Sequence, residues 1–140
     1  MKTKFSPIVR VRKLGVDKAQ KVLRQLDAKL EELEGELLSL HSDVERVHVP
    51  SSGSFSLIRQ NAHIVTMLRE EIHALEFARE ALRMQKAQAA QLVKNAMLEL
   101  EKIEHLHKEE MMEIFARKAK REAKDLDEMG IMLHAIKERG

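Results

Sequence analysis

The fold is decided by residues 16–47, VDKAQKVLRQLDAKLEELEGELLSLHSDVERV. Apolar side chains recur there at alternating intervals of three and four residues. This spacing places them on one side of an α-helix, at the a and d positions of a coiled coil, so the stretch predicts a helix packed against a second helix. The predicted seam consists of Val16, Ala19, Leu23, Leu26, Leu30, Leu33, Leu37, Leu40, Val44 and Val47.

Breaks in the chain set the limits of the predicted helices. Ser6 followed by Pro7 predicts an N-cap and a first helical position. Residues 48–56 combine a proline, a glycine and four serines, which predicts a turn. We therefore expect one helix over about 7–47 and another over about 57–139. Because the turn is short, the two helices should lie antiparallel.

The composition agrees with this arrangement. Charged residues make up 34% of the chain, and it contains four Phe but no Trp or Tyr, so few bulky side chains are available for a globular core. We predict an all-α fold, an antiparallel two-helix coiled-coil hairpin with a longer second helix. It should form a single elongated domain over residues 1–140.

The second predicted helix carries a seam whose register changes along its length. From Val65 to Ile103 the apolar residues hold one phase, interrupted by Arg79 and Lys86, whose aliphatic stems can lie along an apolar seam. The first helix is too short to cover the apolar series that follows, which implies a partner surface. The alternative is that the helix bends back near 104–111 and buries this series internally. The series is Met112, Phe115, Ala119, Leu126, Met129, Leu133 and Ile136.

Charge is distributed unevenly, although the net charge is only +2. Residues 1–24 contain eight basic residues and one acidic residue, whereas residues 25–50 contain two basic and seven acidic residues. A second basic cluster lies within residues 117–124, so the two ends form one basic surface if they meet in space. Binding to nucleic acid is a less favoured alternative, because aliphatic rather than stacking aromatic side chains separate the N-terminal basic residues. The same aliphatic residues would suit an anionic membrane surface, but neither alternative explains the long second helix.

The absence of cysteine fits a reducing compartment, and we expect a cytoplasmic protein. No apolar run approaches the length needed to span a bilayer, which argues against direct membrane insertion.

No motif for catalysis, for a cofactor or for a metal is visible in the sequence. The closest histidines, His105 and His107, are two residues apart and therefore project from different sides of a helix. His105 and Glu109 share a face, as ordinary surface pairs do. There is no His-Glu-x-x-His motif, glycine-rich phosphate loop or nucleophile elbow. We expect a non-enzymatic protein that acts through contacts with other proteins.

Two terminal motifs resemble those of the FliJ family of the bacterial flagellar export apparatus. The N-terminal motif is Lys4-Phe5 with Ile8, Val9 and Arg12. The C-terminal motif matches at Arg121, Glu122, Lys124, Asp127 and Glu128. The chain departs from this motif at Ala123, where the family usually has glutamine. The chain also resembles the stalk proteins of virulence type III secretion.

The resemblance implies a stalk that enters and stimulates a FliI-like hexameric export ATPase and links it to a FlhA-like export gate protein. It further implies peripheral association with the export apparatus at the inner membrane, and contact with export chaperones. Charge and resemblance together predict ATPase contacts at Arg10, Arg12, Lys13, Arg117, Lys118, Lys120, Arg121, Lys124, Asp127 and Glu128. The predicted gate contacts are Leu40, Val44, Val47, Phe55, Ile58 and Ala62, although each could simply close the seam. A homodimeric coiled-coil scaffold stays open as an alternative.

Overall fold

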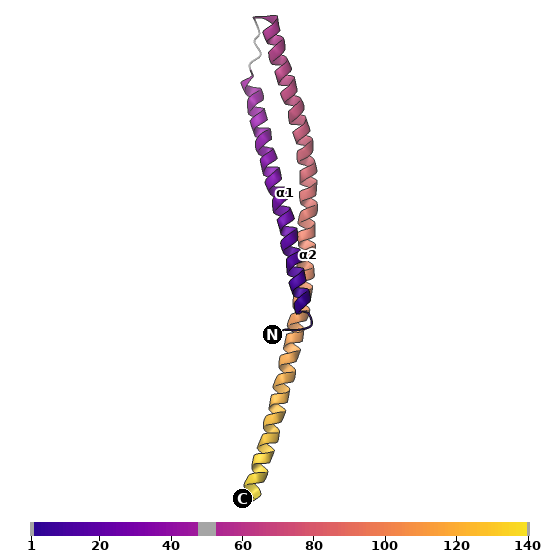
Figure 1. The fold of residues 1–140 in the computed structure, drawn as a ribbon, viewed down its shortest axis with the longest axis vertical. Helices are drawn as coiled ribbons and strands as arrows, with labels where there is room; N and C mark the ends of the chain where they lie inside the picture. The colour runs from indigo at the N-terminus through magenta and orange to yellow at the C-terminus, as the bar shows by residue number, and fades with distance from the viewer. Residues whose placement is uncertain (1, 48–52, 140) are drawn as a thin grey trace. The chain divides into compact units, whose positions relative to one another are not determined.

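The computed structural model describes residues 2–47 and 53–139, which form two α-helices and no strand (Figure 1). Helix α1 comprises Ser6–Arg46 and helix α2 comprises Phe55–Arg139. The predicted all-α hairpin with a longer second helix is confirmed. Within the predicted turn, residues 48–52 lie outside the described residues, and Gly53 has a φ of 122°, a backbone conformation that glycine adopts without steric strain.

Contacts between the helices group the chain into two compact units. We call Met1–Gly15 with Ala96–Gly140 the terminal unit, and Val16–Asn95 the turn unit. The single domain expected over 1–140 stays a prediction.

The core of the turn unit is the predicted seam between α1 and α2. Its buried side chains come from both helices, and most other seam residues are half-buried because a two-helix interface covers each side chain from one direction only. Leu37, at 3% exposure, is the most completely covered. The buried residues are Val16, Leu30, Leu37, Ile72 and Ala89.

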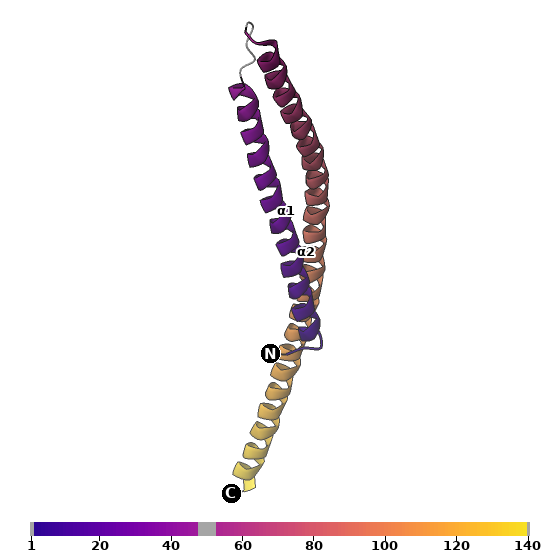
Figure 2. The ribbon, with the colours of Figure 1, turned by 45° about the horizontal axis from the view of Figure 1, so that its top comes forward.

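Ion pairs along the edges of this seam show the antiparallel register of the turn unit. Lys86 Nζ lies 2.7 Å from Asp27 Oδ1, and Arg83 Nη2 lies 3.6 Å from Glu34 Oε1. Farther along α1, His41 Nε2 lies 4.0 Å from Glu76 Oε1. The α2 partner moves back along the sequence as the α1 residue advances, and both ribbon views show the two helices side by side here (Figure 2).

The two basic seam residues differ in how their charge is accommodated. Lys86 is half-buried and brings its ammonium group to the edge of the seam, where Asp27 pairs with it. Arg79 is also half-buried, but its Nε is shielded from solvent and has no hydrogen-bond partner among the described residues. A shielded donor without a partner destabilises the folded state relative to an apolar side chain of similar size.

The terminal unit begins with a cap that differs from the predicted one. Ser6 does not act as the N-cap; its Oγ accepts a hydrogen bond from the backbone N–H of Thr3 at 2.8 Å. Thr3 performs the capping role, because its Oγ1 accepts from the N–H of Phe5 at 3.1 Å and its carbonyl accepts from the N–H of Ser6 at 3.1 Å. The first α-helical bond joins the N–H of Val9 to the carbonyl of Phe5 at 2.9 Å.

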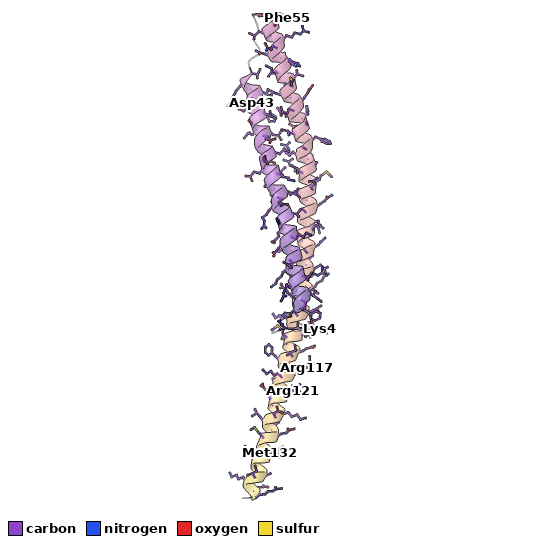
Figure 3. The ribbon with its side chains drawn as sticks, viewed as in Figure 1. Lys4, Asp43, Phe55, Arg117, Arg121 and Met132 are labelled. Carbon is purple, nitrogen blue, oxygen red and sulfur yellow. The ribbon has the colours of Figure 1, made fainter. Side chains whose placement is uncertain are left out.

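Within the terminal unit, α2 continues without interruption through residues 104–111, so the alternative in which the chain bends back there is wrong. Every described residue from 115 to 139 is exposed. Figure 3 shows Arg121 and Met132 projecting from a stretch of α2 that has no other helix beside it. Among the described residues, neither helix has a segment apolar and long enough to cross a membrane.

The unpartnered donor of Arg79 leads to a stability prediction. We expect Arg79→Leu to raise the free energy of unfolding by about 1–2 kcal/mol, because leucine fills a seam position without burying an unpaired donor. Lys86→Leu is the matched control. It should raise the free energy of unfolding less, because this substitution also removes the ion pair with Asp27. Urea denaturation monitored by circular dichroism measures both changes. An Arg79→Leu variant no more stable than the unmodified chain would contradict this account of Arg79.

Candidate protein-interaction surfaces

The N-terminal segment of the terminal unit is fastened to α2 by a hydrogen bond between side chains. Thr3 Oγ1 and His107 Nδ1 are 2.6 Å apart, and both residues are half-buried. His107 occupies the position where the apolar phase of α2, last represented by Ile103, would continue. A polar contact therefore replaces an apolar one where α1 begins.

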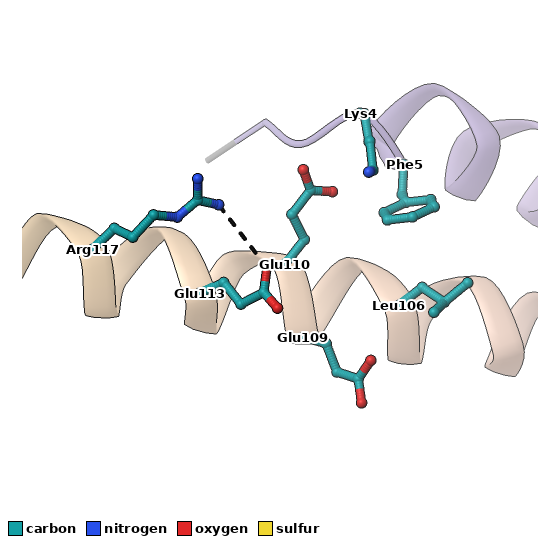
Figure 4. A pocket seen from close by; sticks show the side chains of 7 residues that line it. All are labelled: Lys4, Phe5, Leu106, Glu109, Glu110, Glu113 and Arg117. Carbon is teal, nitrogen blue, oxygen red and sulfur yellow. Dashed lines mark ion pairs between the residues drawn. The ribbon is translucent and has the colours of Figure 1, made fainter.

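Phe5 and Lys4 extend this attachment along α2 (Figure 4). The half-buried Phe5 lines a shallow pocket together with Leu106, and the Nζ of Lys4 lies 5.3 Å from the centre of the Phe5 ring, within the range of a cation–π interaction. The same pocket is lined by the Glu109, Glu110, Glu113 and Arg117 side chains.

The charges in this pocket are only partly matched. Arg117 Nη2 lies 3.9 Å from Glu113 Oε2, but both side chains are largely exposed, so this pair contributes little to stability. One carboxylate oxygen of Glu110 is shielded from solvent and has no hydrogen-bond partner among the described residues. Lys4 and Arg117 line the same pocket, so basic residues from both sequence ends of this unit meet at one place.

All ten predicted ATPase-contact residues belong to the terminal unit, and all are exposed. Three of them, Arg117, Lys118 and Arg121, line a second shallow concavity of α2 with Glu110 and Ile114. The ten residues are Arg10, Arg12, Lys13, Arg117, Lys118, Lys120, Arg121, Lys124, Asp127 and Glu128. Their role in binding stays a prediction.

The predicted gate contacts fall into two groups within the turn unit. Phe55 and Ala62 are exposed, and Phe55 retains 76% of its surface. The other four residues are half-buried seam residues, whose apolar surface is already partly used between the helices; they are Leu40, Val44, Val47 and Ile58. The four therefore offer a partner less surface than a residue on the outer side of the pair.

An outer apolar stripe of α2 in the turn unit was not predicted from the sequence. Phe77, at 81%, is the most exposed large apolar residue of those described, and Met67 and Met84 are also exposed. Ala74 and Ala81 fall between them and complete a series with intervals of seven, three, four and three residues. This spacing is present in the sequence, but it lies on the side of the helix opposite the seam.

Two exposed histidines of the terminal unit, His105 and His134, form surface pairs with glutamates. His105 Nε2 lies 3.1 Å from Glu109 Oε1, and His134 Nε2 lies 3.0 Å from Glu138 Oε1, with all four side chains largely exposed. Within residues 2–47 and 53–139, no group of three or more His, Asp or Glu side chains is arranged to hold a metal ion.

A comparison with protein families gives a match over almost the whole chain. The family model described as Flagellar FliJ protein matches residues 1–139. No curated protein and no solved structure matches the chain. The family match confirms the resemblance drawn from the motifs near the two ends.

The contact between Thr3 and His107 can be tested directly. Thr3→Val removes the hydroxyl that bonds both His107 and the N–H of Phe5, so we expect the start of α1 to lose about 1 kcal/mol of local stability. Hydrogen exchange at the first amides of α1 should then accelerate roughly fivefold. Thr66→Val is the control, because the exposed Thr66 hydroxyl donates only to the Ala62 carbonyl of its own helix, at 3.0 Å. Unchanged exchange in Thr3→Val would show that the hydroxyl does not hold the segment.

Proposed function

The chain belongs to the FliJ family of the flagellar export apparatus, and we propose that it is a stalk that binds and stimulates the hexameric export ATPase and links it to the export gate. It would act without chemistry of its own, in the cytoplasm, as a peripheral component of the apparatus at the inner membrane. The family match favours the flagellar system over a virulence secretion system.

One observation carries the ATPase part of the proposal: the stretch 115–139 of α2 is exposed on all sides and includes a dense basic cluster. A single exposed helix can enter a central hole in a ring of subunits, where side chains on all its faces are available for contact. Arg117, Lys118 and Arg121 converge on one concavity of this helix. Acidic groups lining such a hole would attract these cations and would speed association by electrostatic steering.

The gate part of the proposal uses the outer apolar stripe of α2 in the turn unit. Phe77 and Met84 are exposed and lie two turns apart on one helix face, and aromatic and methionine side chains are enriched in protein interfaces. Phe55, from the predicted gate set, is comparably exposed. We place the gate contact on these residues rather than on the half-buried seam residues.

Charge reversal tests the ATPase contact. The triple variant Arg117→Glu, Lys118→Glu and Arg121→Glu should reduce stimulation of the export ATPase at least tenfold, because repulsion replaces attraction at three convergent positions. Helicity should be retained, since all three side chains are exposed. Steady-state ATP hydrolysis by the assembled hexamer, with increasing amounts of the variant, provides the measurement.

The control for this variant reverses the same number of charges on exposed residues of the turn unit, Lys18→Glu, Lys21→Glu and Arg24→Glu. It should stimulate the ATPase normally. Normal stimulation by the first triple variant, or equal loss in both, would argue against a specific contact at residues 117–121.

The gate contact predicts a separate defect. Phe77→Glu with Met84→Glu should weaken binding to the cytoplasmic part of the gate protein at least tenfold, because it places charge where an apolar anchor would be desolvated. ATPase stimulation should be unaffected. Gln91→Glu is the control, as it adds charge at an exposed position seven residues beyond Met84. Biolayer interferometry on immobilised gate protein would measure these affinities, and unaltered binding by the double variant would refute the placement.

A further inference from the structure

A second coiled-coil seam, unused within this chain, runs along α2 in the terminal unit. We call it the C-terminal stripe: Met112, Phe115, Ala119, Leu126, Met129, Leu133 and Ile136. We propose that Glu122 keeps the C-terminal stripe from pairing with a second copy of this chain and reserves it for a helix of another protein that places a lysine or arginine at the same level.

The C-terminal stripe is not a continuation of the seam used by α1. The half-buried positions of that seam in the terminal unit run through His107, Glu110 and Ile114. Met112 precedes Ile114 by two residues, which turns the stripe by roughly 200° around the helix axis at 3.6 residues per turn. Arg117 and Arg121 occupy the next positions of the seam between α1 and α2. Arg117 and Arg121 therefore lie roughly opposite the stripe, whereas Lys118 lies beside it, one turn before Glu122.

The stripe has the spacing of a helix-binding surface. With Glu122 included, its members alternate strictly at three and four residues from Met112 to Ile136, which are the a and d positions of a coiled coil. Phe115 is 52% exposed, and the other large members are between 59% and 68% exposed. Residues Ala116, Ala123 and Gly130 flank one side of the stripe at every seventh position, so a partner helix meets no bulky side chain on that side; Lys118 and Asp125 flank the other side. A helix is thus the partner that fits.

Glu122 decides which helix can bind. It occupies the d position between Ala119 and Leu126, is exposed, and forms no ion pair with another described residue. Parallel, in-register pairing of two copies would set Glu122 directly against itself. Antiparallel pairing centred on the stripe would bring the two Glu122 residues within about 6 Å along the axis, at 1.5 Å per residue. Two carboxylates in a desolvated seam repel each other.

A partner helix with lysine or arginine at that level removes this repulsion and pairs the carboxylate. Charge complementarity therefore favours a different protein over a second copy. The inference goes beyond the proposed ATPase and gate contacts. It does not rest on either of them, because its test measures self-association of the purified chain alone.

Oligomeric state provides the test. Glu122→Leu completes the apolar seam and should raise the self-association constant at least tenfold, giving a dimer in sedimentation velocity at tens of micromolar where the unmodified chain is a monomer. Glu128→Leu is the matched control: it is the same substitution on the same helix, at an exposed position facing away from the stripe, and should leave the chain monomeric. Circular dichroism checks that both variants stay helical.

A mixing experiment tests the preference for a basic partner. The Glu122→Lys variant should be monomeric alone, because it too repels itself, but an equimolar mixture with the unmodified chain should form a heterodimer. Its association constant should exceed either homodimer constant at least tenfold.

Three results would overturn the inference: dimerisation of the unmodified chain, a monomeric Glu122→Leu variant, or a mixture that stays monomeric. Any of these could occur while charge reversal at Arg117, Lys118 and Arg121 still reduces ATPase stimulation, so the failure of this inference and the failure of the ATPase proposal can be told apart.

Discussion

The structure depends on one constraint: α1, with 41 residues, can cover only about half of α2, with 85. Neither helix has an apolar core of its own, and a long helix in water is stabilised chiefly by burying one face against a neighbour. In the turn unit this requirement is met by the seam around Leu37 and Ile72. In the terminal unit α2 extends beyond α1, so its remaining apolar side chains are exposed.

The seam between α1 and α2 ends near the first turn of α1, where its residues change from apolar to polar. Apolar seam residues give way to His107 and Glu110, and the attachment of α1 changes from apolar packing to the hydrogen bond between Thr3 and His107. A hydrogen bond has directional requirements that apolar packing lacks, so it fixes where along α2 the first turn of α1 begins. Beyond this point the former seam face becomes basic at Arg117, and it no longer offers α1 an apolar surface.

Periodicity predicted most of the fold because burial in a two-helix interface depends mainly on position around the helix. The seam residues follow from it, whereas the antiparallel arrangement followed from the short turn, and the exposure of Met112 and Leu126 from the shorter first helix. The cap was predicted wrongly because Thr3 and Ser6 are both suitable hydroxyl residues, and the choice depends on His107, which is far away in sequence. The outer stripe at Phe77 was not predicted because the seam periodicity assigns only one face of α2 to burial and leaves the opposite face to solvent.

The same geometry separates the proposed contacts of the terminal unit. Arg117 and Arg121 lie on the face of α2 that carries the seam with α1. Leu126 and Leu133 lie on roughly the opposite face, because the apolar register changes at Met112. The two contacts therefore use different side chains, so substitutions can alter one without removing the residues of the other. They differ in physical character as well: the basic face should lose affinity as salt rises, while an apolar seam is much less sensitive to ionic strength. Salt dependence therefore distinguishes which face a given partner uses.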